Sequence, residues 1–222
     1  MRPPEQCDHV QPLKPSECRR CGEKLSGCDP EPLRHQVWEL PEIKPHVREY
    51  QRHRLCCPTC GETTCAELPA GVPQGQSGPR LMAITALLMA YYRQSKRRTA
   101  EFLSTLLGQP CSAALAVKMQ THVTAAVRPA SEELAAQLPT QDQVNADETP
   151  TKEANGKAWL WTFVRCEGVE PTNNAGGSRF VETMLTVIET CRQQRRNAFE
   201  YLTAAVHSHL AHQPAPSLVP GV

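Results

Sequence analysis

Two pairs of cysteines have the spacing of metal-binding turns. Cys18 and Cys21 form the first Cys-x-x-Cys, Cys57 and Cys60 form the second, and a glycine follows each pair. Zinc takes four ligands in a tetrahedron, and one such turn brings two thiolates to the same ion. The glycine lets the backbone turn beneath the metal without a side-chain clash. The sequence therefore predicts one structural zinc ion held by these four thiolates.

The ligand set has competing candidates, because the stretch between the two pairs is longer than in the commonest zinc modules. Cys56 is the main alternative to Cys57, and His53 is a lesser one. A redox-active dithiol and unconnected free cysteines are the other interpretations of the pairs. The chain of 222 residues has 11 cysteines, and its first residues, MRPPEQ, lack the apolar core of a signal peptide. Both features predict a reducing compartment, the cytoplasm.

A cluster of basic residues offers a second kind of chemistry. Arg93, Lys96, Arg97 and Arg98 lie close together, although the formal net charge of the whole chain is only +1. Such a cluster can bind the phosphates of DNA, and a solvated basic face is the alternative. The predicted helices on either side of the turn at 108–111 resemble a helix-turn-helix, for which plain helix packing is the alternative.

Apolar residues at helical spacing dominate the middle and the end of the chain. The helices predicted in this way begin at Pro79, at Arg97, after the capping residue Ser112, near Phe180 and after Asn197. The longest mostly apolar run is shorter than the roughly 20 residues that cross a membrane, so no membrane span is expected. These helices would carry the basic cluster and build most of the core.

Strand signals are shorter and occur in two places. In the cysteine module, 36–40 and 46–52 alternate in part and are separated by prolines, which predicts two short strands. Further on, 144–147 and 159–164 predict a pair of strands around a turn at Gly156. The tail after His212 is rich in proline and alanine and is predicted to be disordered.

The order of several motifs resembles transposases of the insertion sequence 66 family. These motifs are Cys-x-x-Cys-Gly, Gln36-Val-x-Glu-Leu-Pro41, Cys57-Pro-x-Cys60-Gly, Gly78-Pro-Arg, Asp147-Glu-Thr149 and Pro171-Thr-Asn-Asn174. The resemblance covers about residues 7–210. It implies a zinc-binding module, a helical segment and a catalytic core of the ribonuclease-H-like fold. It also implies transposon-end DNA as partner and Mg or Mn as the metal for DNA strand transfer.

Asp147 matches the first catalytic aspartate of that family. Two metal ions in such a core need three carboxylates, because hard cations take oxygen ligands. Asp147 is the last aspartate in the sequence, and Gly176 and Gly177 stand where the family has its glutamate context. The gap between Val164 and Glu170 is too short for the rest of such a core. We therefore expect a transposase with internal deletions, which also lacks the long N-terminal helical region usual in the family.

The sequence as a whole predicts an α+β chain. Its parts are a zinc-ribbon-like module at 1–67, a linker at 68–78, a helical segment at 79–140, a truncated catalytic-core remnant with a C-terminal helix at 141–212, and a disordered tail at 213–222. The expected function is that of a truncated, catalytically incomplete transposase. The alternatives are a zinc-dependent DNA-binding protein that recognises transposon ends or regulates the full-length transposase, and a relic without a stable fold beyond residue 140.

Overall fold

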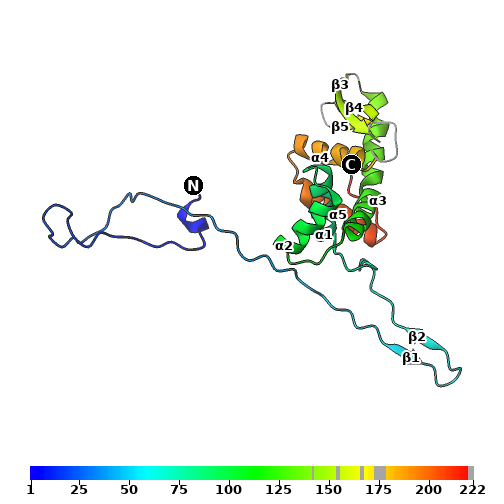
Figure 1. Ribbon diagram of the computed structural model, residues 1–222, viewed down its shortest axis with the longest axis horizontal. Coiled ribbons are helices and arrows are strands. Elements are labelled where there is room, and N and C mark those ends of the chain that lie inside the picture. The colour runs from blue at the N-terminus through cyan, green and yellow to red at the C-terminus, as the bar shows by residue number, and fades with distance from the viewer. Residues whose placement is uncertain (142, 154–155, 166–167, 173–178, 220–222) are drawn as a thin grey trace. The chain divides into compact units, whose positions relative to one another are not determined.

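The computed structural model divides the chain into two units, Met1–Glu42 and Ile43–Val222 (Figure 1). It describes residues 1–141, 143–153, 156–165, 168–172 and 179–219. The combination of helices with small sheets gives an α+β chain, as predicted. Within the described ranges, no helix combines the length and the apolar character that a membrane span needs.

The first unit has no apolar core. None of its residues is buried, and its one helical element is the short 3₁₀ helix η1 (Pro4–Gln6). The side chain of Gln36 accepts a hydrogen bond from the Arg2 N–H at 2.9 Å and donates one to the Arg2 carbonyl at 2.8 Å. The Arg2 guanidinium also lies 4.2 Å from the ring centre of Trp38. A unit of this size without a core depends on an additional constraint, such as a metal ion, for stability.

The second unit begins with a hairpin of two short strands, β1 (Arg54–Cys56) and β2 (Thr63–Cys65). They pair antiparallel, with Leu55 opposite Thr64. The strand predictions at 36–40 and 46–52 were wrong, because both segments are extended without a ladder partner in the described chain. Partial alternation in sequence does not make a strand unless a second segment supplies the hydrogen bonds.

Three helices follow, and their caps explain where they start. These are α1 (Pro79–Ala90), α2 (Lys96–Leu106) and α3 (Ala113–Gln137). Pro79 occupies the first turn of α1, where its missing N–H costs nothing. The hydroxyls of Ser95 and Ser112 accept hydrogen bonds from Arg98 N at 3.3 Å and Leu115 N at 3.1 Å. The predicted starts of these helices are therefore confirmed within one residue.

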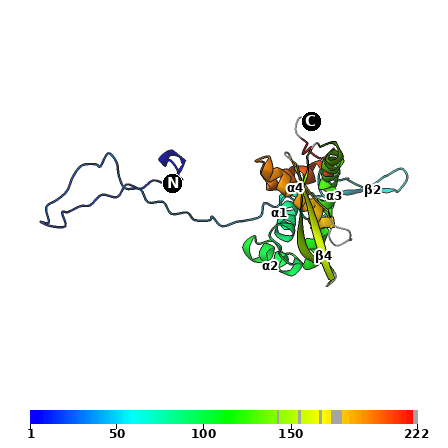
Figure 2. The same cartoon turned by 90° about the horizontal axis from the view of Figure 1, so that it is seen from above.

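Two more helices, α4 (Arg179–Gln193) and α5 (Ala198–Leu210), complete the bundle. Asn197 caps α5 by accepting hydrogen bonds from two backbone N–H groups. Both α4 and α5 contact α1 and α3, as Figures 1 and 2 show. Helices that follow residue 140 therefore pack onto the earlier ones.

The bundle core mixes small and large apolar side chains. On α1 the fully buried positions are Ala83, Thr85, Ala86 and Ala90, and Met82 is 3% exposed, whereas the larger apolar residues predicted to form its buried face lie at the edge of the core. Alanine allows close approach between helices, and larger side chains on the partner helices fill the remaining space. Those fully buried partners include Met119, Val123, Leu134, Met184, Val187 and Leu202.

A three-stranded sheet lies between α3 and α4 in the sequence. It is an antiparallel meander of β3 (Asn145–Glu153), β4 (Gly156–Arg165) and β5 (Gly168–Thr172) with β4 in the centre. The first two strands confirm the predicted pair, and β5 was missed because it is short and contains a proline. Pro150 and Pro171 both lie on edge strands. The outer side of an edge strand has no neighbouring strand, so proline, which lacks an N–H, is tolerated there. Figure 2 shows α4 beside this sheet, and α4 contacts β5.

Residues 213–219 are packed against the bundle, in contrast to the predicted disordered tail. Leu218 is fully buried, and the Tyr201 hydroxyl donates a hydrogen bond to the Pro216 carbonyl at 2.7 Å. Composition suggested disorder because prolines and alanines bury little surface. A single leucine and several side-chain donors of the bundle overcome that tendency. Residues 220–222 lie outside the described chain.

Candidate functional site

The first cysteine pair forms a tight turn. Cys18 donates its N–H to the carbonyl of Glu23 at 2.8 Å, and Gly22 donates its N–H to the carbonyl of Cys18 at 2.9 Å. Gly22 has φ of +73°, which an L-residue with a side chain rarely adopts. The glycine after the pair is therefore required by the backbone, as the sequence predicted.

The second cysteine pair has the same geometry. The Cys57 N–H donates a hydrogen bond to the Glu62 carbonyl at 2.8 Å, and the Gly61 N–H donates one to the Cys57 carbonyl at 2.9 Å. Gly61 also has φ of +73°. The strands β1 and β2 lead into and out of this turn and hold it as the end of a hairpin. Two separate stretches of chain have thus folded into the same turn, although they share little sequence beyond Cys-x-x-Cys-Gly.

Both turns favour a thiolate at their first cysteine. The backbone N–H groups of Arg20 and Cys21 lower the pKa of the Cys18 thiol from its ordinary value. At the second turn, the backbone N–H groups of Cys60 and Thr59 lower the pKa of the Cys57 thiol in the same way. Hydrogen bonds to the charged form stabilise it. Because zinc binds thiolates and not thiols, these donors prepare each turn for a metal ion.

The four predicted zinc ligands are divided between the two units. Cys18 and Cys21 belong to the first unit, and Cys57 and Cys60 belong to the second. Among the described residues, no group of three or more histidine, cysteine or acidic side chains is placed to hold a metal ion. The Cys56 thiol lies 3.4 Å from the Gly61 carbonyl, beside the second turn. The sulfur chemistry and the turn geometry of both pairs nevertheless fit zinc.

Asp147 lies within β3, where its backbone pairs with Thr162 of β4. Its side chain, like those of the aromatic residues 159, 161 and 163 on β4, is outside what the structure describes. The next residue, Glu148, is exposed. The prediction that Asp147 lies at the end of a strand was wrong, because β3 begins at Asn145 and continues past Asp147 to Glu153. Its catalytic role stays a prediction.

The basic cluster lies at the junction of α1 and α2. Arg93 follows α1 with φ of +57°, and Lys96, Arg97 and Arg98 form the first turn of α2. All four side chains are exposed, and in the described part of the chain none of them forms an ion pair. The N-terminal end of a helix carries partial positive charge, so cations there destabilise it unless an anion binds. This arrangement suits a phosphate-bearing partner.

A comparison with protein families adds the deciding observation. Residues 74–176 match the model of the IS66 family of transposases. This segment of the chain is an IS66-family transposase sequence. No curated protein and no solved structure matches the chain.

The transposase segment includes α1, α2, α3 and the strands β3, β4 and β5. It therefore contains both the basic cluster and Asp147. The helices α4 and α5 lie beyond it in sequence but share its hydrophobic core. What the sequence did not reveal is the set of polar side chains that bind residues 216–219, because those side chains come from three different helical regions.

Proposed function

We propose that this protein is a truncated IS66-type transposase that binds DNA and is catalytically incomplete. The basic first turn of α2 within the family segment is the observation that supports DNA binding most strongly. Neutralising phosphates releases counterions from DNA, so this binding is expected to weaken steeply as salt rises. Transposon ends are the proposed target.

Zinc is part of this proposal. The first unit has no buried residues, and the two Cys-x-x-Cys-Gly turns share one backbone geometry. One zinc ion held by Cys18, Cys21, Cys57 and Cys60 would give residues 1–67 the constraint that an absent core cannot supply. The resulting zinc-ribbon-like module would act with the bundle in binding DNA.

The catalytic part of the proposal rests on the number of carboxylates that could bind the catalytic metal ions. Asp147 is the single aspartate from the family motif, and no aspartate follows it in the sequence. Gly176 and Gly177 stand where the family has its glutamate, so the sequence lacks the three carboxylates that a two-metal site requires, and Mg or Mn is not expected to act as a catalytic pair. We interpret the meander β3–β4–β5 as the remnant of a ribonuclease-H-like core.

DNA binding can be tested with terminal-repeat DNA from the cognate element. Binding by fluorescence anisotropy is expected at low salt and should fall as salt increases. The double variant Arg97→Ala with Arg98→Ala is expected to bind more weakly and to show a smaller salt slope, by about one unit for each phosphate that is no longer neutralised. Arg128→Ala, an exposed arginine on α3, is the matched control. Absence of binding at low salt, or a double variant that binds like the wild type, would refute the DNA-binding proposal.

Catalytic incompleteness has a separate test. The zinc-loaded protein is incubated with terminal-repeat DNA and Mg or Mn, and the products are analysed for cleavage and strand transfer. No product is expected. Cleavage that disappears in Asp147→Ala would show an active enzyme and overturn this part of the proposal, while leaving DNA binding intact.

A second candidate function follows from the same site. A chain that binds transposon ends without cutting them would compete with the full-length transposase and so regulate it. Adding the protein to a transposition reaction run by the full-length enzyme should then lower product yield. The Arg97→Ala and Arg98→Ala double variant should not lower it.

A further inference from the structure

The segment 214–219, which we call the strap, is bound by side chains from the connection between α4 and α5 and from α5. Tyr201 donates a hydrogen bond to the Pro216 carbonyl at 2.7 Å, and Arg196 donates one to the Ser217 carbonyl at 3.1 Å. Gln194 donates one to the Leu218 carbonyl at 2.7 Å. Three consecutive carbonyls of the strap are therefore satisfied by three side chains of the bundle, and not by its backbone.

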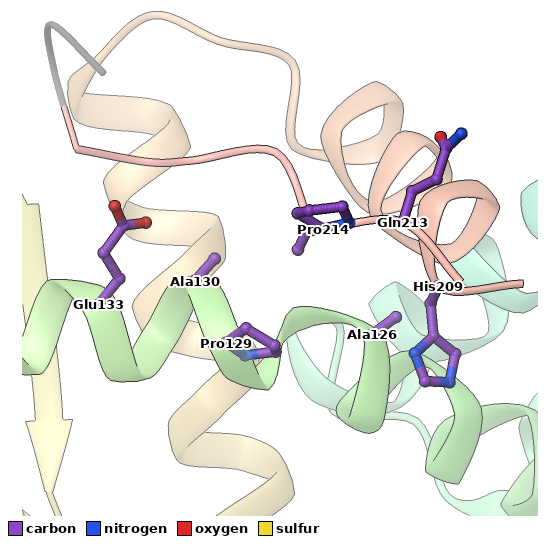
Figure 3. Close-up of a pocket in the computed structure, with 8 residues that line it drawn as sticks. Ala126, Pro129, Ala130, Glu133, His209, Gln213 and Pro214 are labelled. Carbon is purple, nitrogen blue, oxygen red and sulfur yellow. The ribbon is translucent and has the colours of Figure 1, made fainter. Parts of the chain in front are cut away.

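The side chain of Ser217 connects the strap to α3. Its hydroxyl lies 2.9 and 3.0 Å from the two oxygens of the Glu133 carboxylate, to which it donates a hydrogen bond. The same oxygen accepts a hydrogen bond from the Val219 N–H at 3.0 Å. In Figure 3 the Glu133 carboxylate rises from α3 on the side where the strap passes. A serine at this position is thus recognised through both its donor and its acceptor.

Leu218 supplies the apolar anchor of the strap. It is fully buried and belongs to the same core cluster as Leu134 of α3 and Leu202 of α5. Pro214 and Pro216 precede it and restrict the backbone, which lowers the entropy lost when an extended segment binds. An extended segment with one buried side chain and satisfied carbonyls has the features of a bound peptide ligand.

The part of the strap nearest α5 is held much less tightly. A cavity of about 310 Å³ lies beneath it, lined by Ala126, Pro129, Ala130 and Glu133 of α3, by His209 of α5 and by residues 213–215 (Figure 3). His212, at the end of α5, has φ of +55°, a conformation that is costly for a residue with a side chain. The connection between α5 and the anchored residues 216–219 therefore begins at a strained residue, is bonded to α5 through the Gln213 N–H and the Ser208 carbonyl at 2.9 Å, and then borders the cavity.

We propose that Glu133, Gln194, Arg196 and Tyr201 form a peptide-binding site for the strap sequence, and that the strap of a second copy of this chain can occupy it in trans. The same contacts would form in either case, because every strap group that makes them belongs to residues 216–219, which follow the His212 connection. The tether favours the chain's own strap through its high effective concentration. Exchange of the straps would produce a dimer in which the strap of each chain occupies the binding site of the other.

The test uses the full chain with the substitution Leu218→Asp, which places a charge in the buried position and should release the strap. A labelled peptide of sequence PAPSLV, acetylated and amidated, is titrated into this variant and into the wild type. Binding to the variant is expected, and the wild type should bind at least about tenfold more weakly because its own strap fills the site. A peptide with alanine in place of leucine should lose at least about tenfold in affinity.

Several outcomes would overturn the proposal. A variant that keeps wild-type helix content but does not bind the peptide refutes it, as does equal binding by the wild type. If the Leu218→Asp variant does not fold, hydrogen exchange at the Val219 amide of the wild type decides the matter. Exchange at least about tenfold slower than in the free peptide supports the docked strap, and exchange at the rate of the free peptide refutes it. Leu106→Ala, which truncates an exposed leucine of α2, is the control for general destabilisation.

Discussion

Arg80 of α1 lies over the ring of Phe199 on α5, with its guanidinium carbon 4.6 Å from the ring centre. The same guanidinium forms an ion pair with Glu200 at 3.2 Å. Arg80 belongs to the transposase segment, whereas Phe199 and Glu200 follow the segment in the sequence. This contact shows that the helices on both sides of the strands form one bundle.

Replacing Arg80 with alanine tests how much this contact contributes. An exposed cation–π contact and an exposed ion pair each contribute up to about 1 kcal/mol. We expect Arg80→Ala to lower the free energy of unfolding by about 0.5–1.5 kcal/mol in urea denaturation followed by circular dichroism. Arg128→Ala is the matched control and should change it by less than about 0.5 kcal/mol. An equal effect of both substitutions would show that the contact with α5 contributes nothing specific.

The zinc proposal predicts one equivalent of bound metal. Elemental analysis of the purified protein should give about one zinc per chain, since two Cys-x-x-Cys turns complete one tetrahedron. Cys57→Ala should lose the metal, whereas Cys56→Ala should retain it. Loss of zinc in Cys56→Ala with retention in Cys57→Ala would reassign the ligand to Cys56.

The glycine of the second turn is predicted to matter for metal affinity. Gly61 has φ of +73° with no atom within 4 Å of an added Cβ, so Gly61→Ala adds backbone strain without a clash. The cost of about 1–2 kcal/mol should weaken zinc binding by about tenfold. Gly75→Ala is the control, because Gly75 also faces open space but has no positive φ. Competition with a chelator measures both affinities.

Arg195, just after α4, has a left-handed backbone conformation that is strained for arginine and would be unstrained for glycine. It has φ of +56°, and the Arg196 N–H bonds back to the Cys191 carbonyl at 2.7 Å to close the helix. Arg195→Gly should raise the free energy of unfolding by about 0.5–1 kcal/mol, because glycine adopts this conformation without steric strain. Arg195→Ala keeps the strain and should give no such gain. Equal effects of both substitutions in urea denaturation would argue against backbone strain as the cause.

The bundle is predicted to lose stability at alkaline pH. Burial raises the pKa of the Cys191 thiol to about 11, and it also raises the pKa of Tyr201. A pKa raised by folding gives stability that is complete below the unfolded value, near 9, and is lost as pH rises through about 11. For Cys191 this amounts to roughly 2 kcal/mol. Unfolding in urea at pH 8 and at pH 11 should show a smaller loss in Cys191→Ala than in the wild type.

The exposed Cys28 supplies the control for this experiment. Cys28→Ala should keep the wild-type loss of stability between the two pH values, because Cys28 is exposed and belongs to the first unit, not to the bundle core. A Cys191→Ala variant with the full wild-type loss would assign the alkaline effect to other groups, with Tyr201 as the first candidate.

The sequence alone determined the features that depend on neighbouring residues. The start of α3 followed from the capping residue Ser112, because a side-chain cap acts within three residues of its own position. The two cysteine turns followed from Cys-x-x-Cys-Gly for the same reason. The order of motifs was enough to predict the IS66 family.

Only the tertiary structure decided features that join distant parts of the chain. Ser217 and Glu133 are 84 positions apart in the sequence, and no local pattern in the proline-rich tail predicts their hydrogen bond. The burial of three alanines on α1, in preference to the larger residues that the helical pattern indicated, depends on which helices pack there. Local interactions fix caps and turns, whereas burial and long-range hydrogen bonds depend on the three-dimensional position of segments that the sequence does not place together.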